Sequence, residues 1–444
     1  MSATALGATV SCPSDLLPEQ SVKDMNTLPA DIPTTALSHH ERLDRLAQVA
    51  VKVGLGRVTG QQLIVTAPLD AASLARRVTE HAYRAGASLV TTLFADDDAT
   101  LLRFHYAPAD SFDTAPGWLF DGMAAAYRSG AARLAIVGED PVLLAREDPD
   151  KVTRANRARA KAYMPVLELI AGFDTNWTII SAATPAWAKA VFPNEPAEAA
   201  MTRLWDAIFA ISRVDMPDPV AAWHVHDAEL HARAKFLNER RYASLRFRAP
   251  GTDLLVGLAD DHEWTGGSAV AKNGVVCSPN IPTEEVFTTP HKDRVNGLVT
   301  STKPLSYQGT LIEEIRTRFE AGRIVEAKAL KGEEVLHKIL QTDEGSAHLG
   351  EVALVPFSSP VSKSGLLFYN TLFDENAASH IALGQAYKCI IGGAKMSEEE
   401  LVARGTNRSA IHVDWMIGSE QMDVDGLTAG DQPEPLMRQG EWVS

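Results

Sequence analysis

The chain has few cysteines and lacks the glycine-rich motifs that bind nucleotide phosphates. Its three cysteines, Cys12, Cys277 and Cys389, are widely spaced and form no C-x-x-C pair. This pattern excludes a disulfide framework and indicates a reducing compartment, so we expect the protein in the cytoplasm. No G-x-G-x-x-G or G-x-x-x-x-G-K-[ST] sequence occurs, which argues against nucleotide chemistry.

Two further absences narrow the range of partners. No apolar run approaches the ~20 residues that a membrane-spanning helix needs, and the N-terminus lacks the basic and apolar regions of a signal peptide. The chain also has fewer basic than acidic residues: it contains 42 Lys and Arg and 57 Asp and Glu, which gives a formal net charge of −15. Such a surface repels phosphate backbones and anionic lipids, so we expect neither nucleic acid nor membrane as a partner.

The length of 444 residues, 45% of them hydrophobic, predicts more than one domain. Residues 1–38 mix Pro, Ser, Thr and Asp without periodicity, as is typical of a flexible leader. Across 39–243, buried strand patterns alternate with helical ones, which predicts an α/β domain with a mostly parallel sheet. Strands dominate 244–444, which predicts an α+β domain. The strands expected in the first domain are 61–68, 87–95, 132–140 and 176–183.

The stretch "NTLFDENAASHIALGQAY", residues 370–387, places polar side chains among core-type residues. Its pattern predicts a strand over 366–373, a turn at 374–376 and a helix over 377–391. His380 and Tyr387 would then lie two turns apart on one helix face, with Glu375 at the N-terminal end of that helix. The alternative is structural: a helix cap, a hydrogen-bonded core histidine and a packed tyrosine.

A second pair of polar residues lies in "SAIHVDWMIGS", residues 409–419. His412 and Asp414 are two apart in an expected strand, so their side chains project from the same face. An imidazole beside a carboxylate is a metal-binding edge, although many solvated strands carry such a pair. Here the neighbours are apolar, and burying both polar groups requires a partner that offsets their desolvation.

Further carboxylates come from two other segments. "PNIPTEEVFTTP", residues 279–290, holds Glu284 and Glu285 in an extended, proline-bracketed stretch, where adjacent side chains face opposite ways and only one is expected to bind a metal directly. Glu351 opens the apolar strand expected at 351–357. Taken together, the candidates supply four carboxylates and two imidazoles, the ligand mix for two divalent ions that share a bridging carboxylate. The six candidate ligands are Glu285, Glu351, Glu375, His380, His412 and Asp414.

One other polar cluster is expected to be solvated. His224, Asp227 and His231 share a face of the helix expected over 218–243, a spacing that can bind zinc. The neighbouring residues on that helix are charged or amide side chains, which favours an exposed helix face.

Four sequence blocks, in order, resemble the signature blocks of a known enzyme family. They are "PNIPTEEVFTTP", "LGEVALVPFSSPV", "LFYNTLFDENAASHIALGQAY" and "HVDWMIGS". They are similar to those of the aminopeptidase T / aminopeptidase S (PepS-like) family of two-metal exopeptidases. The similarity is close from residue 251 to 444 and looser over 40–243.

The resemblance implies a cytoplasmic homodimer whose second domain is catalytic and removes N-terminal residues from peptides with a free N-terminus. It implies that the six candidate ligands hold two divalent ions, Zn²⁺, Co²⁺ or Mg²⁺, that Glu351 bridges them and that Tyr387 belongs to the active site. The leader and the segment 259–280 depart from the family pattern, so their roles are not carried over.

Two divalent ions can lower the pKa of a shared water to about 7, which supplies a nucleophile for peptide hydrolysis. We expect Glu284 to take the proton from that water, the alternative being an acid that orients a neighbouring ligand by hydrogen bonding. Tyr387 would donate a hydrogen bond to the developing oxyanion, or else only pack. The competing functions are a metallohydrolase of a non-peptide amide or an iron-dependent ring-opening relative on the same scaffold, and a non-catalytic metal-binding protein.

Overall fold

The computed structural model of the protein describes residues 37–307, 309–430 and 432–443. Nearly all of the predicted leader, together with Cys12, lies outside the described residues. His39–Ser444 form one compact unit by their contacts. The predicted division of this unit at residue 243 stays a prediction.

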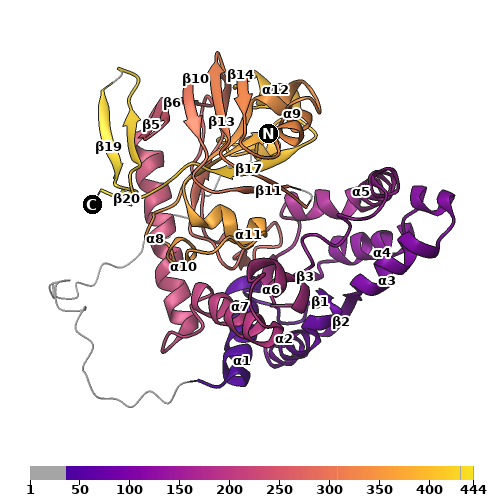
Figure 1. Cartoon of the computed structure of the whole chain (residues 1–444). Coiled ribbons are helices and arrows are strands. Elements are labelled where there is room, and N and C mark those ends of the chain that lie inside the picture. The colour runs from indigo at the N-terminus through magenta and orange to yellow at the C-terminus, as the bar shows by residue number, and fades with distance from the viewer. Residues whose placement is uncertain (1–36, 308, 431, 444) are drawn as a thin grey trace, which may run out of the picture. The chain divides into compact units, whose positions relative to one another are not determined.

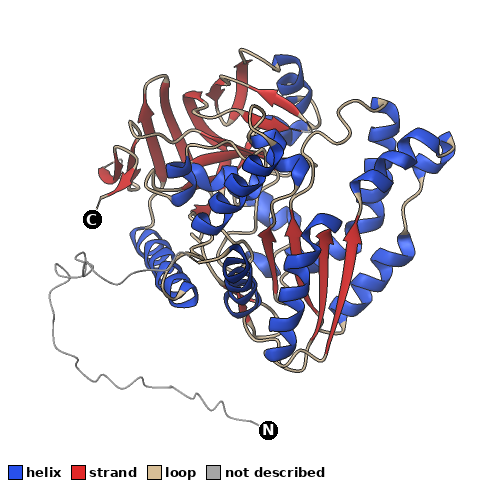
Figure 2. Ribbon diagram, turned by 60° about the horizontal axis from the view of Figure 1, so that its bottom comes forward, coloured by secondary structure: helices blue, strands red, loops and turns tan. Residues whose placement is uncertain are grey.

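A parallel sheet organises the first half of the chain (Figure 2). The strand order is β2-β1-β3-β4, and every neighbouring pair is parallel. The sequence prediction of these strands is confirmed, because apolar runs between helical segments are typical of strands that helices cover. The strands are β1 (Gln62–Pro68), β2 (Leu89–Ala95), β3 (Ala132–Val137) and β4 (Trp177–Ser181).

Helices alternate with these strands and then continue as a helical run that ends at Arg240. Asp96 caps the start of α3 through a bond from the backbone N–H of Ala99, as expected for acids at a helix N-terminus. Asp218 caps the long helix α8 in the same way. The helices are α1 (His39–Val49), the π-helix η2 (Ala50–Leu55), α2 (Ala72–Arg84), α3 (Asp97–Tyr106), α4 (Gly117–Arg128), α5 (Pro149–Ala171), α6 (Pro185–Val191), α7 (Ala197–Ile211) and α8 (Pro219–Arg240).

The second half is mostly antiparallel and builds two larger sheets. One has the order β14-β13-β10-β6-β5-β18-β19-β20, and the other, which carries four of the six candidate ligands, has the order β17-β16-β15-β9. The first consists of β5 (Ser244–Ala249), β6 (Thr252–Leu258), β10 (Pro290–Thr300), β13 (Arg316–Glu320), β14 (Arg323–Lys328), β18 (Asp423–Leu427), β19 (Pro433–Arg438) and β20 (Glu441–Trp442). The second consists of β9 (Val286–Thr288), β15 (Leu349–Leu354), β16 (His380–Gly384) and β17 (His412–Met416).

Short strands and helices complete this half, and the α+β prediction is confirmed. Two small hairpins pair β7 with β8 and β11 with β12. These elements are β7 (Ala269–Val270), β8 (Val276–Cys277), β11 (Leu305–Tyr307), β12 (Thr310–Ile312), α9 (Glu333–Leu340), α10 (Pro360–Ser364), α11 (Thr371–Asp374) and α12 (Glu398–Ala403). Single 3-10 turns occur at Leu69–Ala71, Ala109–Asp113, Glu344–Ala347, Glu375–Ala377 and Gly393–Lys395. None of the described helices combines the length and apolarity of a membrane-crossing segment.

Two predictions around the candidate site are wrong. The strand expected over 366–373 is a loop that leads into α11, and the helix expected over 377–391 contains instead the strand β16. Every residue of β16 is buried, because Ile381 and Leu383 pack into a hydrophobic core on one face and His380 is enclosed by other side chains on the opposite face. A strand buried on both faces reads as a continuous apolar run, which periodicity alone cannot distinguish from a buried helix.

The two halves share a core near the candidate site. Side chains of α10, α11 and the loop between them pack into the hydrophobic cluster of the parallel-sheet half. Helix α10 contacts α7 (Figure 1), and the indole N–H of Trp187 on α6 donates to the carbonyl of Phe368 at 2.5 Å. The parallel-sheet half therefore fixes the chain immediately before Glu375.

Candidate metal centre

One face of the sheet β17-β16-β15-β9 collects the polar side chains. Glu351 pairs in register with Ala382, which pairs with Asp414, so the three residues form a row across neighbouring strands. Because side chains alternate along a strand, His380 and His412 lie on that same face, two positions from Ala382 and Asp414. The opposite face packs into the second hydrophobic core through residues that include Val352, Leu354, Ile381, Leu383, Val413 and Trp415.

A first group of possible ligand atoms comes from Glu285, Glu351 and His380, whose ligand atoms all lie within 4.8 Å of one another. The Nε2 atom of His380 lies 3.1 Å from Oε2 of Glu285 and 3.9 Å from Oε1 of Glu351. All three residues are buried. Three oxygen and nitrogen donors at this spacing are suited to a divalent cation.

A second group comprises Glu351, His412 and Asp414 and meets the same 4.8 Å criterion. The Nε2 atom of His412 lies 3.2 Å from Oε2 of Glu351 and 3.3 Å from Oδ1 of Asp414. Glu351 thus belongs to both groups, and each of its carboxylate oxygens faces a different imidazole.

Backbone carbonyls orient both imidazoles. Nδ1 of His412 lies 2.7 Å from the carbonyl oxygen of Gln385, and Nδ1 of His380 lies 3.2 Å from that of Ala378. An Nδ1–H that donates to a carbonyl leaves the lone pair of Nε2 directed into the cluster, which is the tautomer that binds a cation.

Burial and mutual repulsion raise the proton affinity of the carboxylates. Burial is the main cause for Glu351, and the charges of Glu285 and Asp414 act in the same direction, so the pKa of Glu351 rises to about 7 despite a hydrogen bond from His412. The pKa of Glu375 lies well above its ordinary value, through burial first and then through the charges of Glu285 and Asp414. These carboxylates therefore lack sufficient positive charge among the neighbouring side chains.

The histidines respond in the opposite sense. Burial alone would lower their pKa values, but the carboxylates outweigh it and raise the pKa of His380 to about 10 and that of His412 to about 11. Burial likewise opposes ionisation of Asp414, yet the hydrogen bond from His412 holds its pKa below the ordinary value. Without cations, the cluster holds protons on both imidazoles, and metal binding must displace them.

The residues present fit the binding of divalent cations. Among the described residues, the buried Oε2 atom of Glu285 has only the ion-pair contact with Nε2 of His380 at 3.1 Å and no hydrogen bond of good geometry, so this oxygen could bind a cation. The donor set consists of carboxylates and imidazoles without sulfur, which suits Zn²⁺, Co²⁺ or Mg²⁺ better than a soft metal.

Glu375 and Tyr387 border this cluster. Glu375 and Asp414 line a narrow cavity whose other walls include Leu305, Tyr369 and Met416. The half-exposed Tyr387 follows β16 in a loop, not in the predicted helix, and its ring centroid lies 4.8 Å from that of His412. Partial burial, followed by the charges of Glu351 and Asp414, raises the pKa of its phenol, which stays protonated and able to donate.

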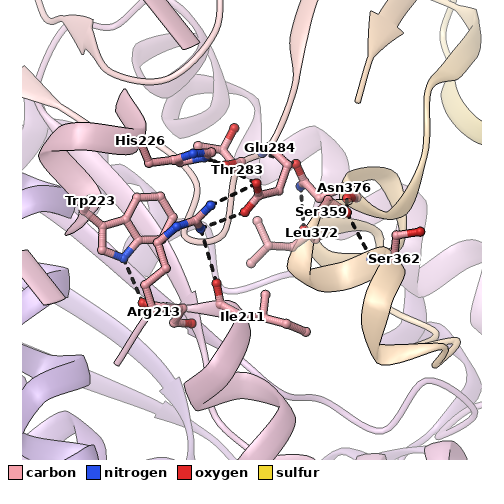
Figure 3. Close-up of polar contacts among 11 residues, drawn as sticks. Ile211, Arg213, Trp223, His226, Thr283, Glu284, Ser359, Ser362, Leu372 and Asn376 are labelled. Carbon is pink, nitrogen blue, oxygen red and sulfur yellow. Dashed lines mark hydrogen bonds and ion pairs between the residues drawn. The ribbon is translucent and has the colours of Figure 1, made fainter. Parts of the chain in front are cut away.

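Glu284 faces away from the cluster. Its carboxylate forms a two-pronged ion pair with Arg213, at 2.7 and 3.0 Å, and lies 3.5 Å from Nε2 of His226 (Figure 3). The prediction that Glu284 and Glu285 have different surroundings is consistent with this placement. Whether Glu284 transfers a proton stays a prediction.

The sequence analysis missed Arg213, His226 and Asn376, which surround Glu284. None carries a local signal, because Arg213 lies 71 positions and Asn376 lies 92 positions from Glu284. In the helix considered as an alternative metal site, Asp227 and His231 instead contact Ser268, with Oδ2 of Asp227 and Nε2 of His231 lying 2.8 and 3.0 Å from the serine hydroxyl.

Comparisons with known proteins identify the family of the chain. The family model described as thermophilic metalloprotease (M29) matches residues 39–442. Aminopeptidase T of Thermus thermophilus is 53% identical over 401 residues, which cover 90% of this chain and 98% of that protein. Aminopeptidase AmpS of Bacillus subtilis is 45% identical over 407 residues, covering 91% and 99%. The solved structure of wild-type AmpT from Thermus thermophilus superposes with a TM-score of 0.88 at 52% identity, over 92% of this chain and 100% of that chain.

Proposed function

The chain belongs to the M29 family of metalloproteases and is an aminopeptidase, and on this premise we propose that two divalent cations act together in its active site. One cation would be held by Glu285, Glu351 and His380, and the other by Glu351, His412 and Asp414. Glu375 would complete the set, because its carboxyl is close enough for the charges of Glu285 and Asp414 to raise its pKa.

The observation that carries this proposal is the position of Glu351. Its two oxygens face His380 and His412 separately, at 3.9 and 3.2 Å. A carboxylate with one oxygen directed to each half of a cluster is the geometry of a bridge between two cations. When bound, the cations supply Lewis acidity and a water that is nucleophilic near neutral pH.

The side chains around the cations would position the substrate. The cavity beside Glu375 and Asp414 is lined by acidic side chains, which would attract the free α-amine of a peptide. A blocked amine would lose this attraction, which is the basis for acting only at the N-terminus. We assign to Tyr387 a hydrogen bond donated to the oxyanion that develops at the scissile carbonyl.

For Glu284 we propose the second of the two predicted roles, that of an acid that orients its neighbour. Both carboxylate oxygens already accept from Arg213. The side chain is only 3% exposed, which leaves no open side for a water or a leaving amine.

The identity of the ions, the cytoplasmic location and the homodimer complete the proposal. The ions are Zn²⁺, Co²⁺ or Mg²⁺, in keeping with the oxygen and nitrogen donors of the site. The location and the dimer follow from the family resemblance, and light scattering of the purified protein tests the dimer directly.

A reconstitution experiment tests the proposed function. Protein stripped by exhaustive chelation should lose hydrolysis of aminoacyl-anilides and regain it with Zn²⁺, Co²⁺ or Mg²⁺, with two ions bound per chain. N-acetylated aminoacyl-anilides should not be cleaved, because they lack the free amine. Undiminished activity after chelation, or equal cleavage of the blocked substrate, would contradict the proposal. The non-peptide-amide and ring-opening alternatives are not favoured, since the relatives that match over nine-tenths of the chain are aminopeptidases.

A further inference from the structure

We propose that Arg213, which lies in the half of the chain that builds the parallel sheet, is a positioning residue for the metal centre. Arg213 holds Glu284 and so sets the position of the adjacent ligand Glu285. The same network reaches the second adjacent ligand, Glu375, through Asn376. The inference rests on the proposed function, since it concerns how two of the proposed ligands are held.

The contact between Arg213 and Glu284 is geometrically specific. The guanidinium donates from Nη1 to Oε1 at 2.7 Å and from Nη2 to Oε2 at 3.0 Å. The side chains are 14% and 3% exposed. Paired, charge-assisted hydrogen bonds fix the direction as well as the distance of a carboxylate, which a single lysine contact does not.

Arg213 is itself held in place. It follows α7 with a positive backbone φ of 58°, and its guanidinium lies 4.7 Å from the ring centroid of Trp223. Trp223 is buried, and its indole N–H donates to the carbonyl of Ser212 at 2.8 Å. The contact with Trp223 therefore fixes the direction in which the guanidinium of Arg213 points towards Glu284 (Figure 3).

His226 holds the same segment from α8. Its Nε2 lies 2.8 Å from the carbonyl oxygen of Thr283 and 3.5 Å from Oε2 of Glu284. Burial outweighs the opposing charge of Glu284 and, together with the charge of Arg213, lowers the pKa of His226, so its neutral imidazole donates from Nε2 to that carbonyl. The buried charges are then one guanidinium and one carboxylate, which balance.

Asn376 joins this network to the other side of the metal centre. Its Oδ1 accepts from the backbone N–H of Glu284 at 2.6 Å, and its Nδ2 donates to the carbonyl of Leu372 at 2.9 Å. Its own carbonyl accepts from the hydroxyl of Ser359 at 2.9 Å. The residues next to two proposed ligands, Glu285 and Glu375, are therefore linked directly to each other.

These contacts lead to a specific effect of losing the guanidinium. Among the described residues, Glu285 belongs to the candidate group with His380 and Glu351 and not to that of His412 and Asp414. Releasing Glu284 should weaken binding at that position and leave the position of His412 and Asp414 unchanged. Removal of a group that orients a metal ligand typically lowers metal affinity by about 10- to 100-fold.

The test is titration of the metal-free full-length protein with Co²⁺, followed by equilibrium dialysis and by the visible absorption of bound Co²⁺. In Arg213→Met and in Glu284→Gln we expect one of two binding steps to weaken by about 10- to 100-fold while the other is unchanged. Turnover of an aminoacyl-anilide should return towards the wild-type kcat at saturating Co²⁺. Arg213→Lys keeps the positive charge but cannot form the paired hydrogen bonds, so its Co²⁺ affinity at the weakened step should lie between that of Arg213→Met and that of the wild type.

Arg45→Met is the matched control. Arg45 donates to the carbonyl of Met216 at 2.9 Å, in the same connection that carries Arg213, but the structure gives it no bond to Glu284. This variant should bind Co²⁺ as the wild type does. If Arg213→Met leaves a buried carboxylate that prevents folding, the double variant Arg213→Met/Glu284→Gln removes that charge and is used in its place.

Several outcomes would overturn the proposal. Unchanged Co²⁺ binding in Arg213→Met contradicts it, as does an equal loss in Arg45→Met. A Glu284→Gln protein that binds both ions normally but has no turnover at saturating Co²⁺ would make Glu284 the proton acceptor instead. All of these outcomes concern variants, whereas a wild-type protein that fails to bind two ions would contradict the proposed function itself.

Discussion

Glu351 lies in the middle of the proposed metal centre, because it belongs to both groups of candidate ligands. It is 3% exposed and belongs to a strand whose residues are all buried, so its charge would be costly without cationic partners. Burial raises its pKa to about 7, which shows that the charged form is disfavoured there. A side chain that is expensive to bury and serves both proposed cation positions should be sensitive to the loss of a single charge.

We therefore predict that Glu351→Gln, which keeps the size and removes the charge, lowers the affinity for both cations. Turnover should fall by at least about 100-fold, more than for a residue that only orients a ligand. Metal content after dialysis and aminoacyl-anilide hydrolysis measure the two effects. Glu326→Gln is the control, because Glu326 is exposed on β14 and its ion pair with Arg318 is worth little. A Glu351→Gln protein that retained two ions would exclude the bridge.

A second prediction concerns the contribution of Asp343 to the free energy of unfolding. Its carboxylate accepts from the backbone N–H of Ala410 at 2.6 Å and from the hydroxyls of Ser409 and Ser346, and so ties the turn before β15 to the chain that enters β17. Partial burial opposes ionisation, but these hydrogen bonds outweigh it and hold the pKa of Asp343 below its ordinary value. Asp343→Asn should lower the free energy of unfolding by about 1–3 kcal/mol at neutral pH.

The sign of the pH dependence follows from the lowered pKa. The carboxylate is ionised in both states above the unfolded pKa of about 3.9, so its full contribution is present there. The contribution is lost as the pH falls through the folded value, and wild type and Asp343→Asn should then converge. Urea unfolding at a series of pH values measures this, and a difference that stayed constant into the acid range would refute it.

The strand β16 has small residues where the proposed ligands of the neighbouring strands approach one another. Ala382 lies between Glu351 and Asp414 in the row of paired residues. At the end of the strand, Gly384 has a φ of +99°, and a Cβ there would collide with the carbonyl of Ile411 beside His412. The small Ala382 side chain therefore adds little bulk between Glu351 and Asp414, and Gly384 lets the backbone at Ile411 approach β16.

We predict that Ala382→Val adds bulk at this point. The added methyl groups would separate Glu351 from Asp414, so metal content should fall and turnover should drop by about 100-fold or more, as expected when ligand positions shift by fractions of an ångström. Ile381→Val is the matched control on the opposite face of the same strand. It should cost about 0.5–1.5 kcal/mol of stability and leave both ions bound. Equal metal loss in the two variants would point to disruption of the strand instead.

The elements that were predicted correctly are those whose burial pattern follows from their own residues. β1 to β4 lie in a helix-covered sheet, and their apolar runs were enough to identify them as strands. Helix α8 has an N-terminal cap and a long polar face, which were enough to identify it as a helix. β16 was missed because all its residues are buried, and the loop at 366–370 because its side chains pack into the core of the other half. His380 was a candidate from its residue type and its apolar neighbours, even though its helical placement was wrong.

Contacts between distant parts of the chain were beyond sequence reasoning. Arg213 belongs to the α7–α8 connection of the first half, yet its guanidinium meets Glu284 beside the metal centre of the second. No periodicity or motif marks such a residue, because its partner is set by how the halves pack. The hydrophobic core shared by both halves is the physical cause of that packing.

A last prediction concerns the effect of metal removal on thermal stability, and it follows from this packing and from the negative charge of the proposed metal centre. Cations that bind only the folded state stabilise it by about 2.7 kcal/mol when their concentration is 100 times the Kd. Because Glu351 and Asp414 lie on two strands of one sheet and Glu285 immediately precedes a third, that stabilisation should extend to the sheet and to the halves that pack around it. Chelation should therefore lower the thermal midpoint of the full-length protein, and added Zn²⁺ or Co²⁺ should restore it. The Glu351→Gln variant should show little response to either treatment, which separates loss of bound metal from any direct action of the chelator. A wild-type midpoint that is insensitive to chelation, measured alongside confirmed metal removal, would mean that the cluster does not hold cations as part of the folded structure.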